Sequence, residues 1–426
     1  MSENNKSQVF AAFADSLSGN RGAVSMLQSA IDNLTVRGVR INVFSVYYRR
    51  DRRLTPQPGV QVVDGTPLSL VFRLTPLAVL YRILRGMGMK RVPRCFGPHF
   101  AALAEADVAL MIGGTTFSDA QKIKVIFNVF CMLPAILLGK KAIMYSQTMG
   151  PFATFFNRTA AKFALGRMDV VVPRGGESLA CVRKLGLPER VKVEYYDDAA
   201  FSLVVTPEAR EEARRRCEGI PRRRGIVGMS VNSIVQRKCR MLGIDYLGVF
   251  VKFTEYLAEN DYTVLLIPHS MRPGAKTDHN NDLFAIDYML ERLSDKARAQ
   301  VVPIRENYDC KVLREVVGVA DLYVASRFHS MISALCTGVP VLVFGWGYQK
   351  YREVMHEFDL DDFCFDARDI SLENLISGFE RLVANREAVA AKIQTNLPAV
   401  AASSRRNHEA AFALATGGEI PGGNAE

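Results

Sequence analysis

The stretch ADLYVASRFHSMISALCTGVPVLVFGWGYQKYREV, residues 320–354, decides the fold class of this chain. Its first apolar run ends at Ala325, and Ser326 is a residue type that caps a following helix. Gly338 ends that helix, and a second apolar run begins at Val341. The pattern predicts a strand, a helix and a second strand, which is the repeating unit of a parallel sheet with helices on its faces.

The same alternation runs along the whole chain. The strand-like runs are VFAAFA, VRINVFSVY, DVALMIGG, KAIMYSQ and DVVVPR in the first half, and GIVGMSVN, YTVLLIPH, DLYVASR and VPVLVFG in the second. Because 426 residues exceed what one hydrophobic core usually supports, two domains are expected. The predicted fold class is therefore α/β, with two doubly wound Rossmann-like domains.

Composition sets the domain limits. We expect an N-terminal domain over residues 1–205 and a charged helix with a linker over 206–224. A C-terminal domain with closing helices follows over 225–412, and the polar, glycine-rich residues 413–426 form a disordered tail. Because residues 206–224 are densely charged, we interpret them as a solvated helix with a linker; an RNA-binding patch is the alternative.

Residues 65–104 interrupt the pattern, because they contain no acidic residue. The basic residues that alternate there with apolar ones are Arg73, Arg82, Arg85, Lys90, Arg91 and Arg94. One interpretation is a helical insertion with a solvated basic face. The other is an amphipathic surface that contacts anionic lipid or a lipid-linked acceptor. The longest apolar stretch, residues 123–139, is broken by polar residues and Pro134, which favours a buried helix over a bilayer crossing.

Overall composition excludes several classes of protein. Hydrophobic residues make up 49% and charged residues 23% of the chain, which excludes a disordered protein. The net charge of +10 favours an anionic partner, but no nucleic-acid-binding motif is present, so no nucleic acid is expected. The eight cysteines show no metal-ligand spacing and the N-terminus no signal-peptide pattern, so we expect a cytoplasmic protein with reduced thiols and no metal.

Arg327 and His329 are the strongest site candidates. They sit where a predicted strand passes into a helix N-terminus, at the carboxyl edge of a parallel sheet. Backbone N–H groups and a guanidinium bind an anion at such a place, and a histidine can move a proton near neutral pH. A structural arginine and a satisfied core histidine are the alternatives. An arginine that only binds ligand is expected to be replaceable without loss of the fold.

Two glycines and an aspartate form a second candidate group. Gly113 and Gly114 follow the run DVALMI and allow a tight turn whose amides face a ligand. Asp119 lies about one helical turn further, where it could accept a proton or orient a hydroxyl of a bound ligand. A plain strand-to-helix turn is the alternative.

Further candidates follow other strand-like runs. Arg174 comes directly after DVVVP, Arg237 and Lys238 follow GMSVNSIVQ, and His269 follows YTVLLIP. Strand ends of this kind are where ligands bind in α/β proteins. Ordinary solvated loops are the competing interpretation for each.

The sequence also resembles a known family. The run SRFHSMISALCTGVPVLVFGWGYQKY, which ends with Lys350, is similar to the C-terminal signature of polysaccharide pyruvyl transferases. SGNRGAVSMLQSAI, with Asn20 and Gly22, resembles the family's Asn-x-Gly turn, and MIGGTTFSD, SQTMGPF, VVPRGGES, DDAAF and IPHS match further motifs in order. Two positions depart from the pattern: Thr115 replaces a usual Gly, and Gly175 replaces the Glu of an Arg-Glu pair.

The resemblance implies a GT-B-like fold with the active site in a cleft between the domains. It implies transfer of pyruvate from phosphoenolpyruvate, a co-substrate, onto sugar hydroxyls as a ketal, with no cofactor. Arg327 and neighbouring cations would bind phosphoenolpyruvate on the C-terminal side, His329 would act as the acid or phosphate-activating group, and Asp119 as the base. The implied acceptor, bound on the N-terminal side, is a sugar or lipid-linked glycan that belongs to a cell-surface polysaccharide or its precursor. The implied location is the cytoplasm, with peripheral contact at the inner face of an anionic membrane as a further expectation.

Two other functions fit the same pattern. The first is a GT-B glycosyltransferase that uses a nucleotide sugar, since fold class and the GVP turn are shared, although such enzymes often carry a Glu-rich motif where this chain has Arg327 and His329. The second is a non-catalytic protein that binds glycan or organises its assembly.

Overall fold

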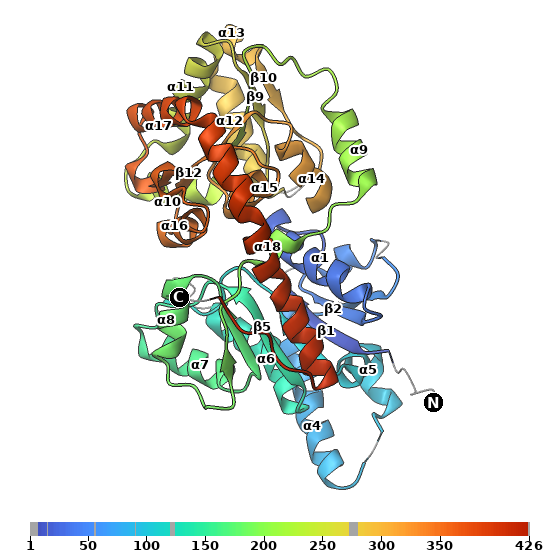
Figure 1. Cartoon of the computed structure of the whole chain (residues 1–426). Helices are drawn as coiled ribbons and strands as arrows, with labels where there is room; N and C mark the ends of the chain where they lie inside the picture. The colour runs from blue at the N-terminus through green and yellow to red at the C-terminus, as the bar shows by residue number, and fades with distance from the viewer. Residues whose placement is uncertain are drawn as a thin grey trace. The chain divides into compact units, whose positions relative to one another are not determined.

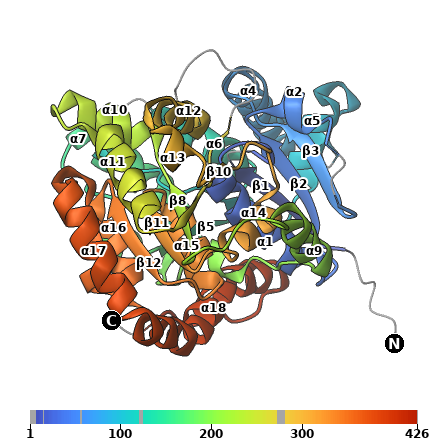
Figure 2. The ribbon, with the colours of Figure 1, turned by 90° about the horizontal axis from the view of Figure 1, so that it is seen from above.

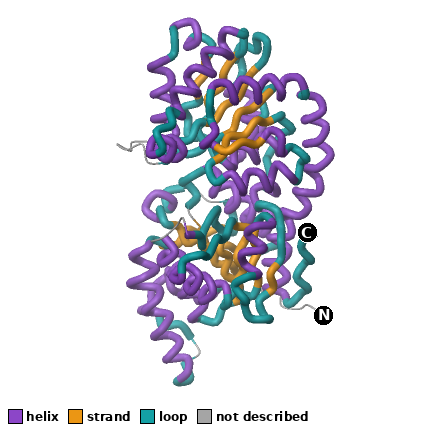
Figure 3. Tube along the Cα trace, turned by 90° about the vertical axis from the view of Figure 1, so that its left-hand side faces the viewer, coloured by secondary structure: helices purple, strands orange, loops and turns teal. Residues whose placement is uncertain are grey.

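The computed structural model describes residues 7–14, 16–54, 57–89, 91–119, 124–271 and 280–424. The chain divides into two compact units. The first comprises Met1–Gly19, Ala23–Val204 and Ala401–Glu426, and the second comprises Asn20–Gly22 and Val205–Val400. In each unit, strands lie enclosed by helices, as Figure 3 shows by colour.

The first unit is built on a parallel sheet of seven strands in the order β3-β2-β1-β4-β5-β6-β7 (Figure 1). The strands are β1 Val9–Ala14, β2 Arg40–Ser45, β3 Val60–Asp64, β4 Val108–Met111, β5 Lys141–Gln147, β6 Val170–Pro173 and β7 Lys192–Val193. The central strands are buried on both sides, which explains why they read as continuous apolar runs.

Helices connect these strands. They are α1 Arg21–Thr35, α2 Tyr48–Asp51, α3 Pro67–Ser69, α4 Thr75–Gly86, α5 Gly97–Glu105, α6 Lys124–Leu137, α7 Phe155–Leu165 and α8 Gly176–Arg183, with a π-helical turn Leu70–Leu74 and 3-10 turns Arg94–Phe96 and Ala199–Ser202. In α1 the buried residues Val24, Leu27, Ile31 and Leu34 recur every three or four positions, so one face of the helix packs on the core.

The second unit is built on a parallel sheet of six strands in the order β10-β9-β8-β11-β12-β13. The strands are β8 Ile226–Ser230, β9 Thr263–Leu266, β10 Val301–Pro303, β11 Leu322–Ala325, β12 Val341–Gly345 and β13 Cys364–Asp366. The helices are α9 Pro207–Arg216, α10 Ser233–Met241, α11 Tyr246–Glu259, α12 Asp282–Arg292, α13 Asp295–Arg298, α14 Cys310–Val317, α15 Phe328–Cys336, α16 Tyr348–His356, α17 Leu372–Ala384 and α18 Arg386–Thr416, with 3-10 turns Asp361–Phe363 and Ala367–Asp369. Figure 2 shows α11 and α17 on one face of this sheet and α14 and α15 on the other.

The predicted α/β class with two parallel-sheet domains is confirmed, and each of the nine strand-like runs contains a strand. The division of the chain differs from the expected limits in two places: Asn20–Gly22 belongs to the second unit and Ala401–Glu426 to the first. Polar groups of α18 explain the second difference. The Asn407 side chain accepts from the Ser146 backbone N–H at 3.0 Å, and the Ser404 hydroxyl donates to the Asp198 carbonyl at 2.7 Å.

The expected tail differs from the prediction within the described residues: residues 413–416 belong to helix α18, and residues 417–424 form an irregular segment of the first unit. The Asn424 backbone N–H donates to the Tyr195 carbonyl at 2.9 Å. The basic residues 65–104 are mainly helical, and Lys90 lies outside the described residues. Helix α6, which contains Pro134, buries four of its 14 residues, and several of its other apolar residues pack partly buried against the same core. The expected buried helix is thus a half-buried one, with Ile126 exposed.

Candidate active site

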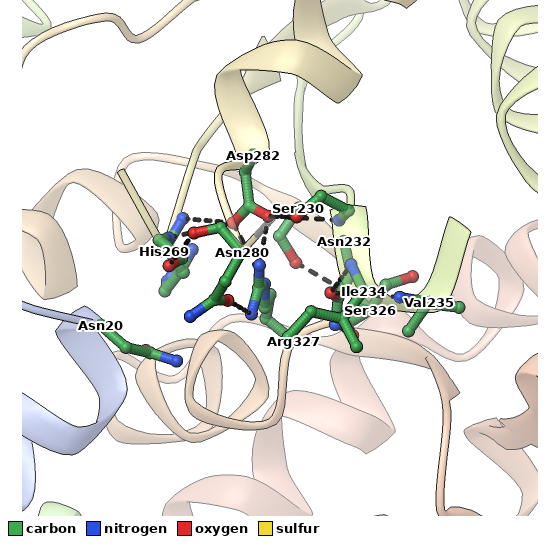
Figure 4. A network of polar contacts seen from close by, with 12 residues as sticks. Asn20, Ser230, Asn232, Ile234, Val235, His269, Asn280, Asp282, Ser326 and Arg327 are labelled. Carbon is green, nitrogen blue, oxygen red and sulfur yellow. Dashed lines mark hydrogen bonds and ion pairs between the residues drawn. The ribbon is translucent and has the colours of Figure 1, made fainter. Parts of the chain in front are cut away.

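The candidate active site lies at the carboxyl edge of the sheet of the second unit. Asn232 follows β8, His269 follows β9 and Arg327 follows β11. Because parallel strands end at the same edge, the three side chains come together there. Figure 4 shows them around Asp282, the first residue of α12.

The start of α15 differs in detail from the prediction. The helix begins at Phe328 with Arg327 at its N-cap, whose backbone is still extended (φ −108°, ψ 132°). The expectation that Ser326 caps this helix is wrong, because Ser326 lies one residue too early. Its carbonyl instead accepts from the side chain of Asn232 at 3.0 Å and from the Tyr351 hydroxyl at 3.3 Å.

The Arg327 guanidinium is held by a buried carboxylate. Arg327 is 6% exposed, its Nε donates to Asp282 Oδ2 at 3.1 Å, and its Nη2 donates to Asp282 Oδ1. Its Nη1 donates to Asn280 Oδ1 at 2.9 Å. Three of the five N–H groups of the side chain are thus used. An anion can contact Arg327 only through the others.

Asp282 is a central residue that the sequence analysis missed. It is fully buried and accepts from the backbone N–H groups of His269 at 3.1 Å, Ser270 at 3.0 Å and Ser233 at 3.3 Å. These bonds, with the ion pair to Arg327, join the segments that follow β8, β9 and β11. The only sequence signal was an acidic residue at a helix start, which is too common a feature to single it out.

His269 presents a neutral ring to the same site. It is 3% exposed, and its Nδ1 lies 3.3 Å from the Ile267 carbonyl, which assigns the proton to Nδ1. Burial lowers the pKa of His269 to about 4, although the nearby Asp282 charge acts in the opposite direction. Within the described part of the chain, Nε2 has no hydrogen-bond partner. The ring is therefore a hydrogen-bond acceptor at neutral pH and not one more cation.

The Asn20–Gly22 turn belongs to this site as well. The Asn20 side chain accepts from the Gly22 backbone N–H at 2.9 Å, and the Arg21 backbone N–H donates to the His269 carbonyl at 3.1 Å. A Cβ placed on Gly22 would lie 2.2 Å from Nδ1 of His329. The imidazole of His329 thus packs directly on the Gly22 backbone, and only glycine leaves it room.

The remaining cations predicted for this half lie on helices. Arg237 and Lys238 are in the second turn of α10, so the expectation that they follow a strand directly is wrong; the helix already begins at Ser233. Lys238 Nζ lies 5.0 Å from the centre of the Trp346 ring, and burial, with the Arg237 charge, lowers the pKa of Lys238. Lys350 on α16 lies with its Nζ 5.4 Å from the Phe328 ring centre.

In the first unit, Arg174 joins the loops that follow β4, β5 and β6. It is 6% exposed and its Nη1 pairs with the buried carboxylate of Asp198. Its Nε donates to the Thr148 hydroxyl at 3.0 Å, and its Nη2 donates to the Gly114 carbonyl at 2.9 Å. The position after β6 is as predicted, and the contacts are those of a residue that fixes loops.

Asp119 also has protein partners. Its carboxylate accepts from the Ala153 backbone N–H at 2.7 Å, the Thr154 hydroxyl at 2.7 Å and the Asn157 side chain at 3.1 Å. Burial alone would raise the pKa of Asp119, but these hydrogen bonds outweigh it and lower the pKa. A carboxylate with a lowered pKa is a weaker base, so its assignment as the base stays a prediction that these bonds do not favour.

Gly113 and Gly114 form the turn after β4. A Cβ on Gly113 would come no closer than 3.4 Å to Thr116, and one on Gly114 no closer than 3.9 Å to Arg174. Both positions have room for a side chain, unlike Gly22. Over the residues that the structure describes, no three His, Cys, Asp or Glu side chains group together as metal ligands.

Comparison with known proteins identifies the family. A model of the family described as polysaccharide pyruvyl transferase matches residues 20–348, a range that contains Asn20, Asp119, Arg174, His269 and the Arg327–His329 segment. This chain belongs to the polysaccharide pyruvyl transferase family. The amylovoran biosynthesis protein AmsJ of Erwinia amylovora is 21% identical over 387 residues, which cover 87% of this chain and 91% of AmsJ. The family expected from the motifs is thereby confirmed.

Solved structures place this family member in a wider fold group. The S. aureus MnaA structure with UDP has a TM-score of 0.63 at 10% identity and covers 98% of this chain and 100% of its own. A putative UDP-N-acetylglucosamine 2-epimerase from Listeria monocytogenes scores 0.60 at 12% identity, with 99% and 100% covered, and a glycosyltransferase from Rickettsia africae scores 0.51 at 13%, with 96% and 99% covered. These likenesses confirm the GT-B-like fold class and carry no information on substrate.

Proposed function

We propose that this chain transfers the pyruvyl group of phosphoenolpyruvate onto two hydroxyls of a sugar in a polysaccharide or its precursor. The family supports a transferase that acts on polysaccharide. One observation carries the finer proposal: Asn20–Gly22, His269 and the Arg327–His329 segment, far apart in the sequence, meet at one sheet edge. A proton-transfer group, a neutral acceptor and a cation are what ketal formation from an anionic donor needs.

The proposed reaction begins with protonation of the methylene carbon of phosphoenolpyruvate by His329. A sugar hydroxyl oxygen then bonds to the cationic carbon that results, and the bond from that carbon to the phosphate oxygen breaks. A second hydroxyl of the same sugar closes the ring. Of the two hydroxyl protons released, one replaces the proton taken from His329 and the other leaves with the phosphate.

The side chains divide this work according to their surroundings. Arg327, oriented by Asp282, offers its remaining N–H groups to the donor carboxylate or phosphate. Lys238 and Lys350 are the further cations that we assign to phosphate binding. His269, neutral and with an unprotonated Nε2, fits a hydrogen-bond acceptor for the attacking hydroxyl. Gly113, Gly114 and Arg174 shape the loops that we assign to the acceptor.

The acceptor is the less defined substrate. AmsJ is named for amylovoran biosynthesis and the family for polysaccharide, which supports a polysaccharide or its precursor as the acceptor class. We propose a cytoplasmic location, which the eight free cysteines support because reduced thiols are typical of that compartment. Phosphoenolpyruvate is a co-substrate, and the proposal needs no further cofactor.

Ligand-induced stabilisation tests the donor. Phosphoenolpyruvate at 100 times its Kd should stabilise the protein by about 2.7 kcal/mol, because it binds only the folded state. Thermal unfolding is measured with phosphoenolpyruvate, UDP or GDP. Stabilisation by a nucleotide alone would favour the glycosyltransferase alternative, which the GT-B-like fold permits. Phosphate release with phosphoenolpyruvate and a panel of glycan acceptors then separates an enzyme from a non-catalytic binder, which releases none.

Gly22→Ala tests the site geometry. The added methyl would lie 2.2 Å from His329 Nδ1, so the imidazole must move. A displacement of about 1 Å at a reacting group lowers turnover roughly 10²-fold. Gly176→Ala is the matched control, because a Cβ there meets nothing within 4 Å. Phosphate release is measured for both variants; equal rates for the two would contradict a catalytic position for His329.

A further inference from the structure

One helical run in the first unit is apolar on two opposite faces. It comprises α3, the π-helical turn and α4, and it extends past the end of the sheet of its unit (Figures 1 and 3). One face is buried: Leu70, Leu74, Ala78 and Tyr81 join the core of the unit. A helix that is apolar all round belongs in a protein core or in contact with lipid. Packing in the core explains why one face of this run is apolar, but it does not explain why the opposite face is apolar too.

The opposite face is apolar and exposed. Leu68 is 72% exposed, Phe72 74%, Ile83 55% and Met87 78%, and Val79 and Leu80 complete the row. Leu68, Phe72, Val79, Ile83 and Met87 are spaced by four or seven residues, about one or two helical turns, so they form one stripe along the helix. We call this stripe, with the arginines beside it, the α4 face. Such a row of large apolar side chains marks an interaction surface.

The charges beside the stripe are all of one sign. Arg73, Arg82 and Arg85 lie on the same run and are exposed, and the sequence from residue 65 to 104 has no acidic residue. Arg82 and Arg85, with Leu137 of α6, also line a pocket beside the C-terminal half of α4. A surface that combines apolar anchors with arginines complements an anionic lipid interface, in which phosphate lies above acyl chains.

We propose that the α4 face docks on the surface of an anionic phospholipid membrane, with its helix in the plane of the interface. By length and composition, Pro67–Gly86 could cross a bilayer. Its inner face, however, packs in the core of the first unit, and crossing would take that face away from the core. The proposal stands independently of the proposed function, because it rests on no residue of the candidate active site.

Co-sedimentation of the full chain with vesicles tests the proposal. Vesicles of phosphatidylglycerol and phosphatidylcholine should bind the protein, vesicles of phosphatidylcholine alone should bind it far less, and high salt should release it. Arg73→Gln, Arg82→Gln and Arg85→Gln together should lower the partition coefficient about five-fold per charge at low salt. Leu68→Ser, Phe72→Ser and Ile83→Ser together should lower it at least ten-fold.

Matched variants elsewhere serve as controls. Arg49→Gln, Arg50→Gln and Arg53→Gln remove the same charge from another exposed part of the first unit, and Val36→Ser, Met241→Ser and Leu242→Ser remove other exposed apolar side chains. Each control should bind as the unaltered chain does. Equal losses in the controls, absence of binding to phosphatidylglycerol, or resistance of bound protein to carbonate extraction would overturn docking in the plane. So would sedimentation equilibrium showing a dimer that the serine variants dissociate.

Discussion

Arg327→Ala is expected to destabilise the second unit by about 3–5 kcal/mol, in addition to abolishing transfer. The reason is the carboxylate that it leaves behind. Asp282 is fully buried and pairs with two nitrogens of Arg327, so its charge would lose its counter-ion in the interior. The sequence alone suggested a replaceable, ligand-binding arginine. Because Arg327 pairs with a buried carboxylate, we expect the variant to lose stability as well as activity.

Tryptophan fluorescence reports the unfolding of the second unit, because Trp346 is the only tryptophan of the chain and follows β12 of that unit. Denaturant midpoints are compared for Arg327→Ala and for Arg352→Ala, which breaks an exposed pair with Asp361 and should cost at most about 1 kcal/mol. Adding Asp282→Asn to Arg327→Ala should recover part of the stability but no transfer. A midpoint for Arg327→Ala close to that of Arg352→Ala would show that the ion pair is not a structural element.

His329→Gln is expected to lower turnover by about 10²-fold or more, with a much smaller change in affinity for phosphoenolpyruvate. Glutamine keeps hydrogen bonding but cannot titrate. If His329 transfers the proton to the methylene carbon, the pH–rate profile of the unaltered protein should show a limb that the variant lacks. A histidine that only holds phosphate would give weaker binding with turnover at saturation preserved.

The measurement is kcat and KM for phosphoenolpyruvate across pH 5.5 to 8.5, a range that brackets the ordinary histidine pKa of about 6.5. His356→Gln is the control, because His356 is an exposed histidine of α16 that pairs with Asp361. It should leave both constants unchanged. A kcat for His329→Gln within a few-fold of the unaltered protein throughout would falsify the proton-transfer role.

The sequence determined the central part of both sheets. Strands such as β4, β5 and β11 are buried on both sides, so their composition alone marks them as strands. The four that no quoted run contained, β3, β7, β10 and β13, are the edge strands of the two sheets. They are only partly buried, and β7, β10 and β13 have only two or three residues each, so their sequences lack a continuous apolar run. Central strands are buried because they have a neighbouring strand on each side, whereas edge strands have one on a single side only.

The sequence also determined the family and the order of its motifs, because each motif is a local pattern of residue types at fixed spacing. It placed Arg327 and His329 at the end of a strand, where β11 and α15 put them. Motif order cannot say which segments meet. The grouping of Asn20–Gly22 with the second unit follows from contacts between residues hundreds of positions apart.

Only the tertiary structure decided what each charged group does. Arg327 pairs with Asp282, and Arg174 pairs with Asp198. Both pairs form because folding removes water from these charged groups, and a buried charge is stable only with a partner of opposite charge. His269 lost its charge for the same reason, since burial disfavours the protonated ring. Residue type and spacing determine on which strand end or helix a side chain lies. Its protonation and its hydrogen-bond partners depend on segments distant in the sequence, because those segments exclude water from it and supply the partners.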